Sequence, residues 1–119
     1  MDYLSGILHT VVELPEFIKR SENLLSENAR MDLIEYLVAY PTAGVLIRGA
    51  GGLRKLRWAS KGKGKRGGLR VLYYYCDREM PLFLLTVFEK ANQPDLSQKE
   101  CKELAGLTTL LRQQYRGDR

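Results

Sequence analysis

The sequence predicts an α+β fold in which a small antiparallel sheet is flanked by helices, in the order β-α-α-β-β-β-α. Three strand-like segments follow one another between residues 53 and 89 with short links, which favours antiparallel pairing. Helical periodicity precedes and follows this block, so helices are expected to bury the apolar side of the sheet. The chain has 119 residues without an internal repeat or linker, and we expect a single domain over residues 1–119.

The N-terminal part is expected to hold one strand and two helices. ILHTVV, residues 7–12, is rich in β-branched and apolar residues. Pro15 suits the first turn of a short helix that runs to about residue 22. Ser26 can cap a second helix, which must end near Tyr40 because Pro41 disfavours helical geometry in the residue before it.

The rest of the chain is expected to form three strands and a last helix. Residues 53–59 alternate in polarity, residues 69–77 are rich in strong β-formers, and residues 81–89 form a continuous apolar run. DREMP, between the last two strands, has the length and composition of a hairpin turn. Ser97 and Glu100 form a capping box, after which apolar residues recur at helical spacing.

Positive charge is concentrated in one segment. The chain has 19 Lys and Arg and 14 Asp and Glu, a net charge of +5. From Gly44 to Cys76 nine residues are basic and none is acidic, giving +9, so the remainder, with ten basic and fourteen acidic residues, carries −4. Repulsion within such a segment opposes compactness, and the pattern is typical of proteins that bind a polyanion. A solvated charged loop is the alternative.

The glycines of this segment do not form a nucleotide-binding motif. Residues 62–67 match GxGxxG, but a strand follows them where a dinucleotide site needs a helix N-terminus. The GK[ST] ending of a P-loop is also missing. What remains is a basic loop able to follow a sugar–phosphate backbone through Lys61, Lys63, Lys65 and Arg66.

Few residues suit metal or covalent chemistry. One histidine and two separated cysteines give no zinc pattern, the acids do not cluster for Mg²⁺, and no cofactor is expected. No apolar run reaches the ~18 residues of a membrane span, and the N-terminus does not resemble a secretory signal. We therefore expect a cytoplasmic protein without membrane contact, whose reactive groups are Lys and Arg.

RNA cleavage is a reaction that such groups can promote. The 2′-hydroxyl of RNA can attack the adjacent phosphate and leave a cyclic phosphate, so no external nucleophile or metal is needed. The protein must hold the backbone, stabilise the pentacoordinate phosphate with cations and help move protons. Alternation places Lys55 and Arg57 on one strand face, and Arg70 on the next strand can reach the same side. A nonspecific binding face is the alternative.

Two stretches carry a family resemblance: GAGGLRKLRWASKGKGKRGGLRVLYYY and, after it, FLLTVFEKANQPDLS. Over about residues 44–112 the chain resembles the HigB-like branch of the RelE/ParE toxin superfamily. The resemblance implies a RelE-like fold and the toxin of a type II toxin–antitoxin system. It also implies a metal-independent endoribonuclease that enters the ribosomal A site and cleaves mRNA. The implied partners are mRNA, the ribosome and a cognate HigA-like antitoxin with a helix-turn-helix domain, with operator DNA bound only through the complex.

The same resemblance implies roles for individual residues. Arg57 and Arg70 would contact the RNA backbone and the transition-state phosphate. Lys55 is the candidate for proton transfer, and Lys90 for stabilising the phosphate or the leaving group. Further RNA contacts are expected from Arg54, Lys61, Lys63, Lys65, Arg66, Trp58 and Tyr73.

Aromatic residues complicate these assignments. Several RelE-type enzymes use a tyrosine near the C-terminus, but no Tyr lies between Tyr75 and Tyr115, and a position that is often Tyr in relatives is Phe88. Strand alternation sets Tyr74 opposite Tyr73 and Tyr75, and at least one of these two faces is expected in the core. For Trp58, core packing is the alternative to stacking on a base.

Two other functions stay open at this point. One is a ParE-like inhibitor of DNA gyrase, which shares the fold but acts by binding. The other is a non-catalytic nucleic-acid-binding module. The four basic residues at the implied catalytic positions favour the nuclease.

Overall fold

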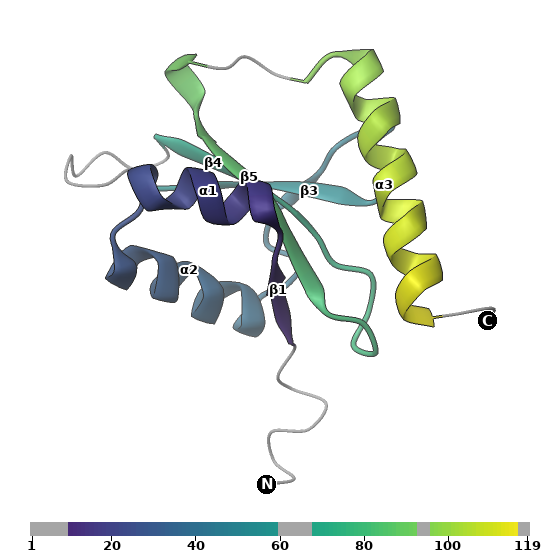
Figure 1. Cartoon of the computed structure of the whole chain (residues 1–119), viewed down its shortest axis with the longest axis horizontal. Helices are drawn as coiled ribbons and strands as arrows, with labels where there is room; N and C mark the ends of the chain where they lie inside the picture. Colours follow the sequence, from purple (N-terminus) through teal and green to yellow (C-terminus); the bar gives the residue numbers. More distant parts are fainter. Residues whose placement is uncertain (1–9, 60–67, 93–95, 117–119) are drawn as a thin grey trace, which may run out of the picture.

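The computed structural model describes residues 10–59, 68–92 and 96–116, and it confirms the α+β fold class (Figure 1). The elements in chain order are β1 (Val11–Glu13), α1 (Pro15–Leu24), α2 (Glu27–Ala39), β2 (Val45–Leu46), β3 (Leu53–Trp58), β4 (Leu69–Tyr74), β5 (Leu82–Glu89), the short 3₁₀ helix η1 (Lys90–Asn92) and α3 (Gln98–Arg116).

The strands form one mixed sheet in the order β1-β5-β4-β3-β2. β2 to β5 pair antiparallel, whereas β1 runs parallel to β5, with Val11 opposite Leu82. The prediction of a wholly antiparallel sheet is therefore wrong at this edge. β1 and β5 are far apart in the chain: after β1 the chain passes through α1 and α2 to β2 at the opposite edge of the sheet, and it returns through β3 and β4 to β5. Parallel neighbours need such a long connection, because a tight turn can join only antiparallel strands. β2 has no counterpart among the strands predicted from the sequence.

Local sequence features set the helix ends as predicted. The Ser26 hydroxyl accepts a hydrogen bond from the Ala29 N–H at 3.1 Å and caps α2, which stops before Tyr40. At α3 the capping box is complete: the Glu100 N–H donates to the Ser97 hydroxyl, and the Ser97 N–H donates to the Glu100 carboxylate. Of the strand expected at 7–12, residues 7–9 lie outside the described residues, and β1 ends one residue later than predicted.

The helices cover opposite faces of the sheet, with α1 and α2 on one side and α3 on the other (Figure 1). We call these the α1/α2 face and the α3 face. The α1/α2 face is a closed core in which Phe17, Leu33 and Leu37 pack on Val71 and Tyr73, all fully buried. Burying such side chains is the main stabilising contribution to a fold of this size.

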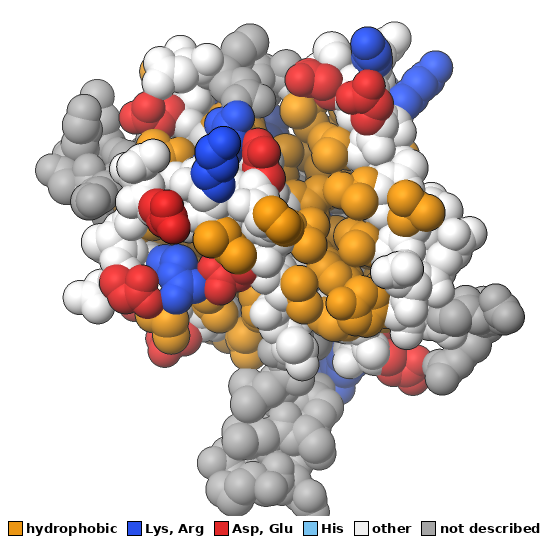
Figure 2. All heavy atoms as spheres, viewed as in Figure 1, with side chains coloured by type: hydrophobic (Ala, Val, Ile, Leu, Met, Phe, Trp, Pro, Cys, Tyr) orange, Lys and Arg blue, Asp and Glu red, His pale blue; other side chains and the backbone are white. Residues whose placement is uncertain are grey.

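The α3 face is covered less completely. α3 has 19 residues, but among its described side chains only Thr108 is buried. That residue marks a close approach: the Thr108 hydroxyl donates to the Gly51 carbonyl at 2.9 Å, and a Cβ on Gly51 would lie 2.8 Å from the Cα of Ala105. In the view of Figure 2, hydrophobic side chains remain visible in a continuous strip between α1 and α3. α3 thus leaves part of its face of the sheet open.

Candidate active site

The predicted cations meet on the α3 face. In the antiparallel pairing of β3 and β4, Arg57 lies directly opposite Arg70, and Lys55 lies opposite Leu72. Paired residues point to the same side of a sheet, and Leu72 belongs to the core cluster under α3. Lys55, Arg57 and Arg70 therefore share one face, as the alternation in the sequence predicts.

The arginine pair continues across the sheet to β5. Arg70 lies opposite Phe88, so Arg57, Arg70 and Phe88 form one row across three strands. Lys90 follows two residues after Phe88, is exposed, and its N–H donates to the Gly68 carbonyl at 3.1 Å. The backbone of Lys90 is thus fixed at the end of the row where β5 passes into η1.

Like charges directly opposite each other in a sheet are destabilising. Arg57 is exposed and Arg70 is half-buried, with its guanidinium donating to the Leu69 carbonyl at 3.1 Å. Close to the start of α3 the sheet therefore changes from an apolar core to a cationic surface. Such a change stabilises the fold less than an apolar row would, and it provides a place for an anion.

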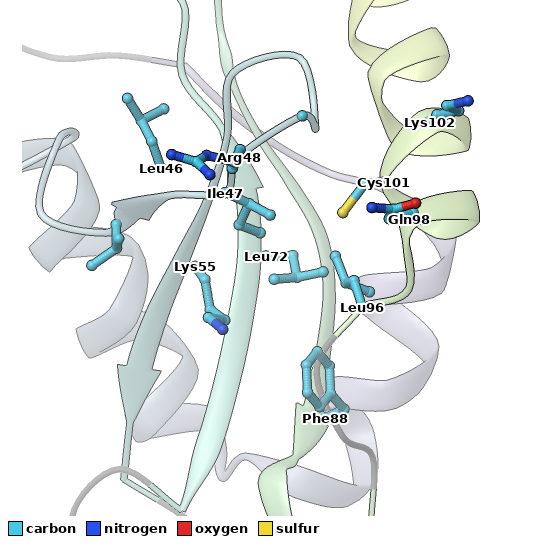
Figure 3. Close-up of a pocket in the computed structure, with 12 residues that line it drawn as sticks. Leu46, Ile47, Arg48, Lys55, Leu72, Phe88, Leu96, Gln98, Cys101 and Lys102 are labelled. Atoms are coloured by element: carbon cyan, nitrogen blue, oxygen red, sulfur yellow. The ribbon is translucent and has the colours of Figure 1, made fainter.

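A cleft opens beside Lys55, between the sheet and the start of α3, and Arg57 and Arg70 are not among the residues that line it (Figure 3). Its volume is about 660 Å³. Leu72, Phe88 and Leu96 supply an apolar wall, and Lys55 lies across from them in Figure 3. The remaining lining residues come from the β2 region and from the first turns of α3: Val45, Leu46, Ile47, Arg48, Gly49, Gln98, Cys101 and Lys102.

Arg48, Leu96, Gln98 and Lys102 are site residues that sequence reasoning missed. Arg48 lies in the turn before β3 and belongs to the basic segment, whereas the other three come from the region at the start of α3, far from the basic strands in the chain. The one available indication was the capping box, because it fixes the start of α3 and so sets Gln98 and Lys102 on its first turns.

The prediction that Tyr73 contacts RNA is wrong. Its side chain is fully buried on the α1/α2 face, and its hydroxyl is already paired twice. It accepts a hydrogen bond from the Gly44 N–H and donates one to the Pro41 carbonyl, each at 2.8 Å. Burial raises the pKa of the Tyr73 hydroxyl, and the bond from Gly44 lowers it in part. Tyr73 thus fastens the α2–β2 connection to the sheet.

Arg54 and Trp58 also lie away from the three cations, because alternation turns them toward the α1/α2 face. The Arg54 guanidinium donates to the carbonyls of Gly44 at 2.8 Å and Thr42 at 3.3 Å, which gives it a structural role in the same connection. Trp58 packs on the core with its ring 5.5 Å from that of Tyr36. Lys61, Lys63, Lys65 and Arg66 lie outside the described residues.

The tyrosine on the α3 face is structural too. The Tyr74 side chain is buried, and its hydroxyl accepts a hydrogen bond from Arg112 of α3 at 3.2 Å. Burial raises the pKa of Tyr74, and the bond from Arg112 opposes this effect. Tyr74 therefore holds α3 on the sheet and lies two residues beyond the cleft.

Two further observations concern metal ligands and membranes. Within residues 10–59, 68–92 and 96–116, no three His, Cys, Asp or Glu side chains gather in a way that could hold a metal ion. None of the described helices is both long and apolar enough to cross a bilayer.

Comparison with known proteins bears on the same region. A family model described as the RelE toxin of the RelE/RelB toxin–antitoxin system matches residues 47–116, which is more than half of the chain. A solved structure of the E. coli toxin RelE, a double arginine-to-alanine mutant in the free state, matches with a TM-score of 0.54 at 15% sequence identity. That match covers 85% of this chain and 97% of the E. coli chain, and it shows the shared fold.

Proposed function

The chain belongs to the RelE toxin family, and from this we propose that it is the toxin of a type II toxin–antitoxin system and a metal-independent endoribonuclease. Its substrate is mRNA in the ribosomal A site, and cleavage there inhibits translation. The resemblance of residues 44–112 supports the HigB-like branch of the family for this chain.

The observation that carries this proposal is the arginine pair. Arg57 and Arg70 lie directly opposite each other on the open part of the α3 face. Two guanidiniums side by side match the charge of a phosphate that gains negative charge in the transition state, and Arg binds phosphate through paired N–H groups. Removing a group that stabilises such a charge typically costs about 10²–10³ in rate.

The reaction itself needs few groups. The 2′-oxygen of the ribose forms a bond to the adjacent phosphorus, and the bond from phosphorus to the 5′-oxygen of the next nucleotide breaks. The 2′-hydroxyl loses a proton and the leaving 5′-oxygen gains one, so the products are a 2′,3′-cyclic phosphate and a 5′-hydroxyl. Arg57 and Arg70 hold the pentacoordinate phosphate between these two proton transfers.

Lys55 and Lys90 lie on the two sides of the arginine row. Lys55 precedes Arg57 by two residues on the same face and lines the cleft. We assign it the proton transfer at the 2′-hydroxyl, with the nucleobase beside that ribose held against Leu72 and Phe88. Lys90, anchored through Gly68 at the end of the row, is assigned the leaving oxygen.

The partners follow from the same proposal. A cognate HigA-like antitoxin with a helix-turn-helix domain neutralises the toxin, and the complex rather than the toxin alone binds operator DNA. The basic residues at 61, 63, 65 and 66 contact ribosomal RNA or mRNA outside the chemical step.

The test is to induce the protein in bacteria, alone and as Arg57→Ala and Arg70→Ala, and to map mRNA 5′ ends. We expect translation-dependent cuts inside coding regions with the unaltered chain, and their loss in both variants. Growth arrest with intact mRNA and cleaved DNA would instead assign the chain to gyrase inhibition. If the cells continue to grow, a non-catalytic nucleic-acid-binding module is the remaining function.

A further inference from the structure

An aromatic cluster lies on the opposite side of the sheet from the arginine pair. Tyr36 of α2 contacts Tyr40 with ring centroids 5.2 Å apart and Trp58 of β3 at 5.5 Å. Tyr40 is 60% exposed and Tyr36 38% exposed. Single exposed aromatics are ordinary, but a row of three rings in which Tyr36 contacts both of the others is a feature that folding alone does not require.

The cluster is held on a rigid support. Tyr40 directly follows the last residue of α2, and hydrogen bonds to three carbonyls, those of Pro41, Thr42 and Gly44, hold the next turn on the sheet. Tyr73 and Arg54 make these bonds. The rings are therefore presented in a fixed arrangement, which lowers the entropy lost when a flat ligand stacks on them.

Although the cluster and the arginine pair lie on opposite faces of the sheet, both are close to the same open edge of β3. β2 pairs only with Arg54 and Lys55, and within the described residues no strand pairs with Leu56–Trp58 on the side away from β4. At this edge Arg57 points to the α3 face and Trp58, the next residue, points to the α1/α2 face. A strand of RNA whose phosphate lies at Arg57 can pass over this edge to the rings.

We propose that Tyr36, Tyr40 and Trp58 form a second RNA contact, on which an unpaired base stacks outside the cleavage site. Arg57, exposed at the open edge, supplies the positive charge for the phosphate that precedes the stacked base, whereas the Arg54 guanidinium is held by the Thr42 and Gly44 carbonyls and Asp32 and Glu35 of α2 flank Tyr36. Stacking on aromatic rings is the usual way in which proteins hold unpaired bases. Three partly exposed rings are too small for a stable protein interface, which buries roughly 800 Å² on each partner.

This inference rests on the proposed function because it takes RNA as the ligand. Trp58 is the only tryptophan of the chain, so its fluorescence reports directly on this surface. The probe is a single-stranded RNA oligonucleotide with 2′-O-methyl groups, which lacks the nucleophile and cannot be cleaved by the proposed reaction. A fluorophore on the oligonucleotide measures total binding by anisotropy in the same titration.

We expect quenching of Trp58 that follows the binding curve. Tyr40→Ala should weaken binding about tenfold, since stacking on one ring is worth roughly 1–3 kcal/mol. Tyr40→Phe keeps the ring and should bind within twofold of the unaltered chain. Leu110→Ala removes a side chain of similar exposure, 58%, from α3 and serves as the matched control.

Full binding by anisotropy without quenching of Trp58 would overturn the inference, as would unchanged binding by Tyr40→Ala. Quenching by the purified antitoxin but not by RNA would assign the surface to a protein and overturn it as well. The result is separable from the proposed function. If the chain does not cleave mRNA on ribosomes but RNA quenches Trp58, the stacking surface is supported and the proposed nuclease activity is wrong. If the chain cleaves mRNA but RNA does not quench Trp58, the nuclease activity is supported and the stacking surface is wrong.

Discussion

The two faces of the central sheet use the same strands for different purposes. Along β4, Leu69, Val71 and Tyr73 are fully buried under α1 and α2. The alternate residues start with Arg70 at the open end of the α3 face and become buried only at Leu72 and Tyr74. Both faces therefore carry a buried core, but only the α3 face lacks packing at one end, where the cations gather.

The difference between the two faces indicates how a small domain can remain folded with two arginines that repel each other. A pair of opposed arginines costs stability, and a domain of this size has little stability to lose. The cost is tolerable because the α1/α2 face is closed on its own. Changes on the α1/α2 face should therefore affect unfolding, and changes at the open end of the α3 face should affect activity.

The largest effect should come from Phe17→Ala, which removes a fully buried ring from the α1/α2 face. We expect a loss of about 3–5 kcal/mol in the free energy of unfolding, measured by urea denaturation. The matched change on the other face is Tyr115→Ala, because Tyr115 is 51% exposed and touches Phe83 edge-on. It should cost no more than about 1.5 kcal/mol. Equal losses would show that the faces do not differ as described.

Tyr73→Phe should have an intermediate effect. The variant keeps the ring but leaves the Gly44 N–H and the Pro41 carbonyl without their partner. An unpaired buried polar group costs about 1–3 kcal/mol, and cleavage by the folded protein should be unchanged. Tyr40→Phe, which removes an exposed hydroxyl, is the control. A loss of cleavage activity without a loss of stability would contradict the structural role and would show that Tyr73 contributes to the functional site.

The same variant should alter the response to alkaline pH. The pKa of Tyr73 is raised by burial above the ordinary value of 10.0, so the neutral hydroxyl is favoured in the folded chain. Its contribution to stability is fully present below pH 10 and is lost as the pH rises through the higher folded pKa. Thermal melts between pH 9 and about 11 should show a steeper decline for the unaltered chain than for Tyr73→Phe. Parallel curves would contradict this role.

Gly51→Ala tests how α3 is held. Gly51 has φ +69°, and an added Cβ would meet the backbone of Ala105 at 2.8 Å. We expect a loss of about 1–2 kcal/mol and a displaced α3, seen as faster amide exchange along that helix. Gly49→Ala shares the positive φ but has open space around its Cβ, so it isolates the conformational part of the cost. Slow exchange in Gly51→Ala would contradict the close approach.

The smallest effect should be a gain. Arg57→Gln removes one charge of the opposed arginine pair and should raise the free energy of unfolding by up to about 1 kcal/mol, while impairing cleavage. Arg78→Gln, on the exposed turn before β5, should leave both unchanged. A destabilised Arg57→Gln would mean that the pair is held by interactions that outweigh its repulsion.

Local chemistry made much of the fold predictable from the sequence. Ser26, Pro41 and the capping box at Ser97 define helix ends through neighbours a few residues away. The period of two along β3 brought Lys55 and Arg57 to one face, and an antiparallel partner brought Arg70 to them.

The rest depended on contacts between distant segments. Alternation separates Tyr73 from Tyr74 but does not say that helices close over both faces at that point, so the burial of Tyr73 was missed. The parallel pairing of β1 with β5 joins two segments that two helices and three strands separate in the chain, so no local pattern predicts it. The cleft is lined by Arg48 of the β2–β3 turn and Lys102 of α3 as well as by Lys55, and the sequence does not show that these segments meet.

The most direct test of the arginine pair is single-turnover cleavage of mRNA on purified, programmed ribosomes, with Arg57→Ala and Arg70→Ala each compared with the unaltered chain. Cosedimentation in the same reactions measures how much protein is bound. The account predicts products with 2′,3′-cyclic phosphate ends, and cleavage about 10²–10³ slower in each variant at equal ribosome occupancy. Cleavage at the unaltered rate by either folded variant would contradict it.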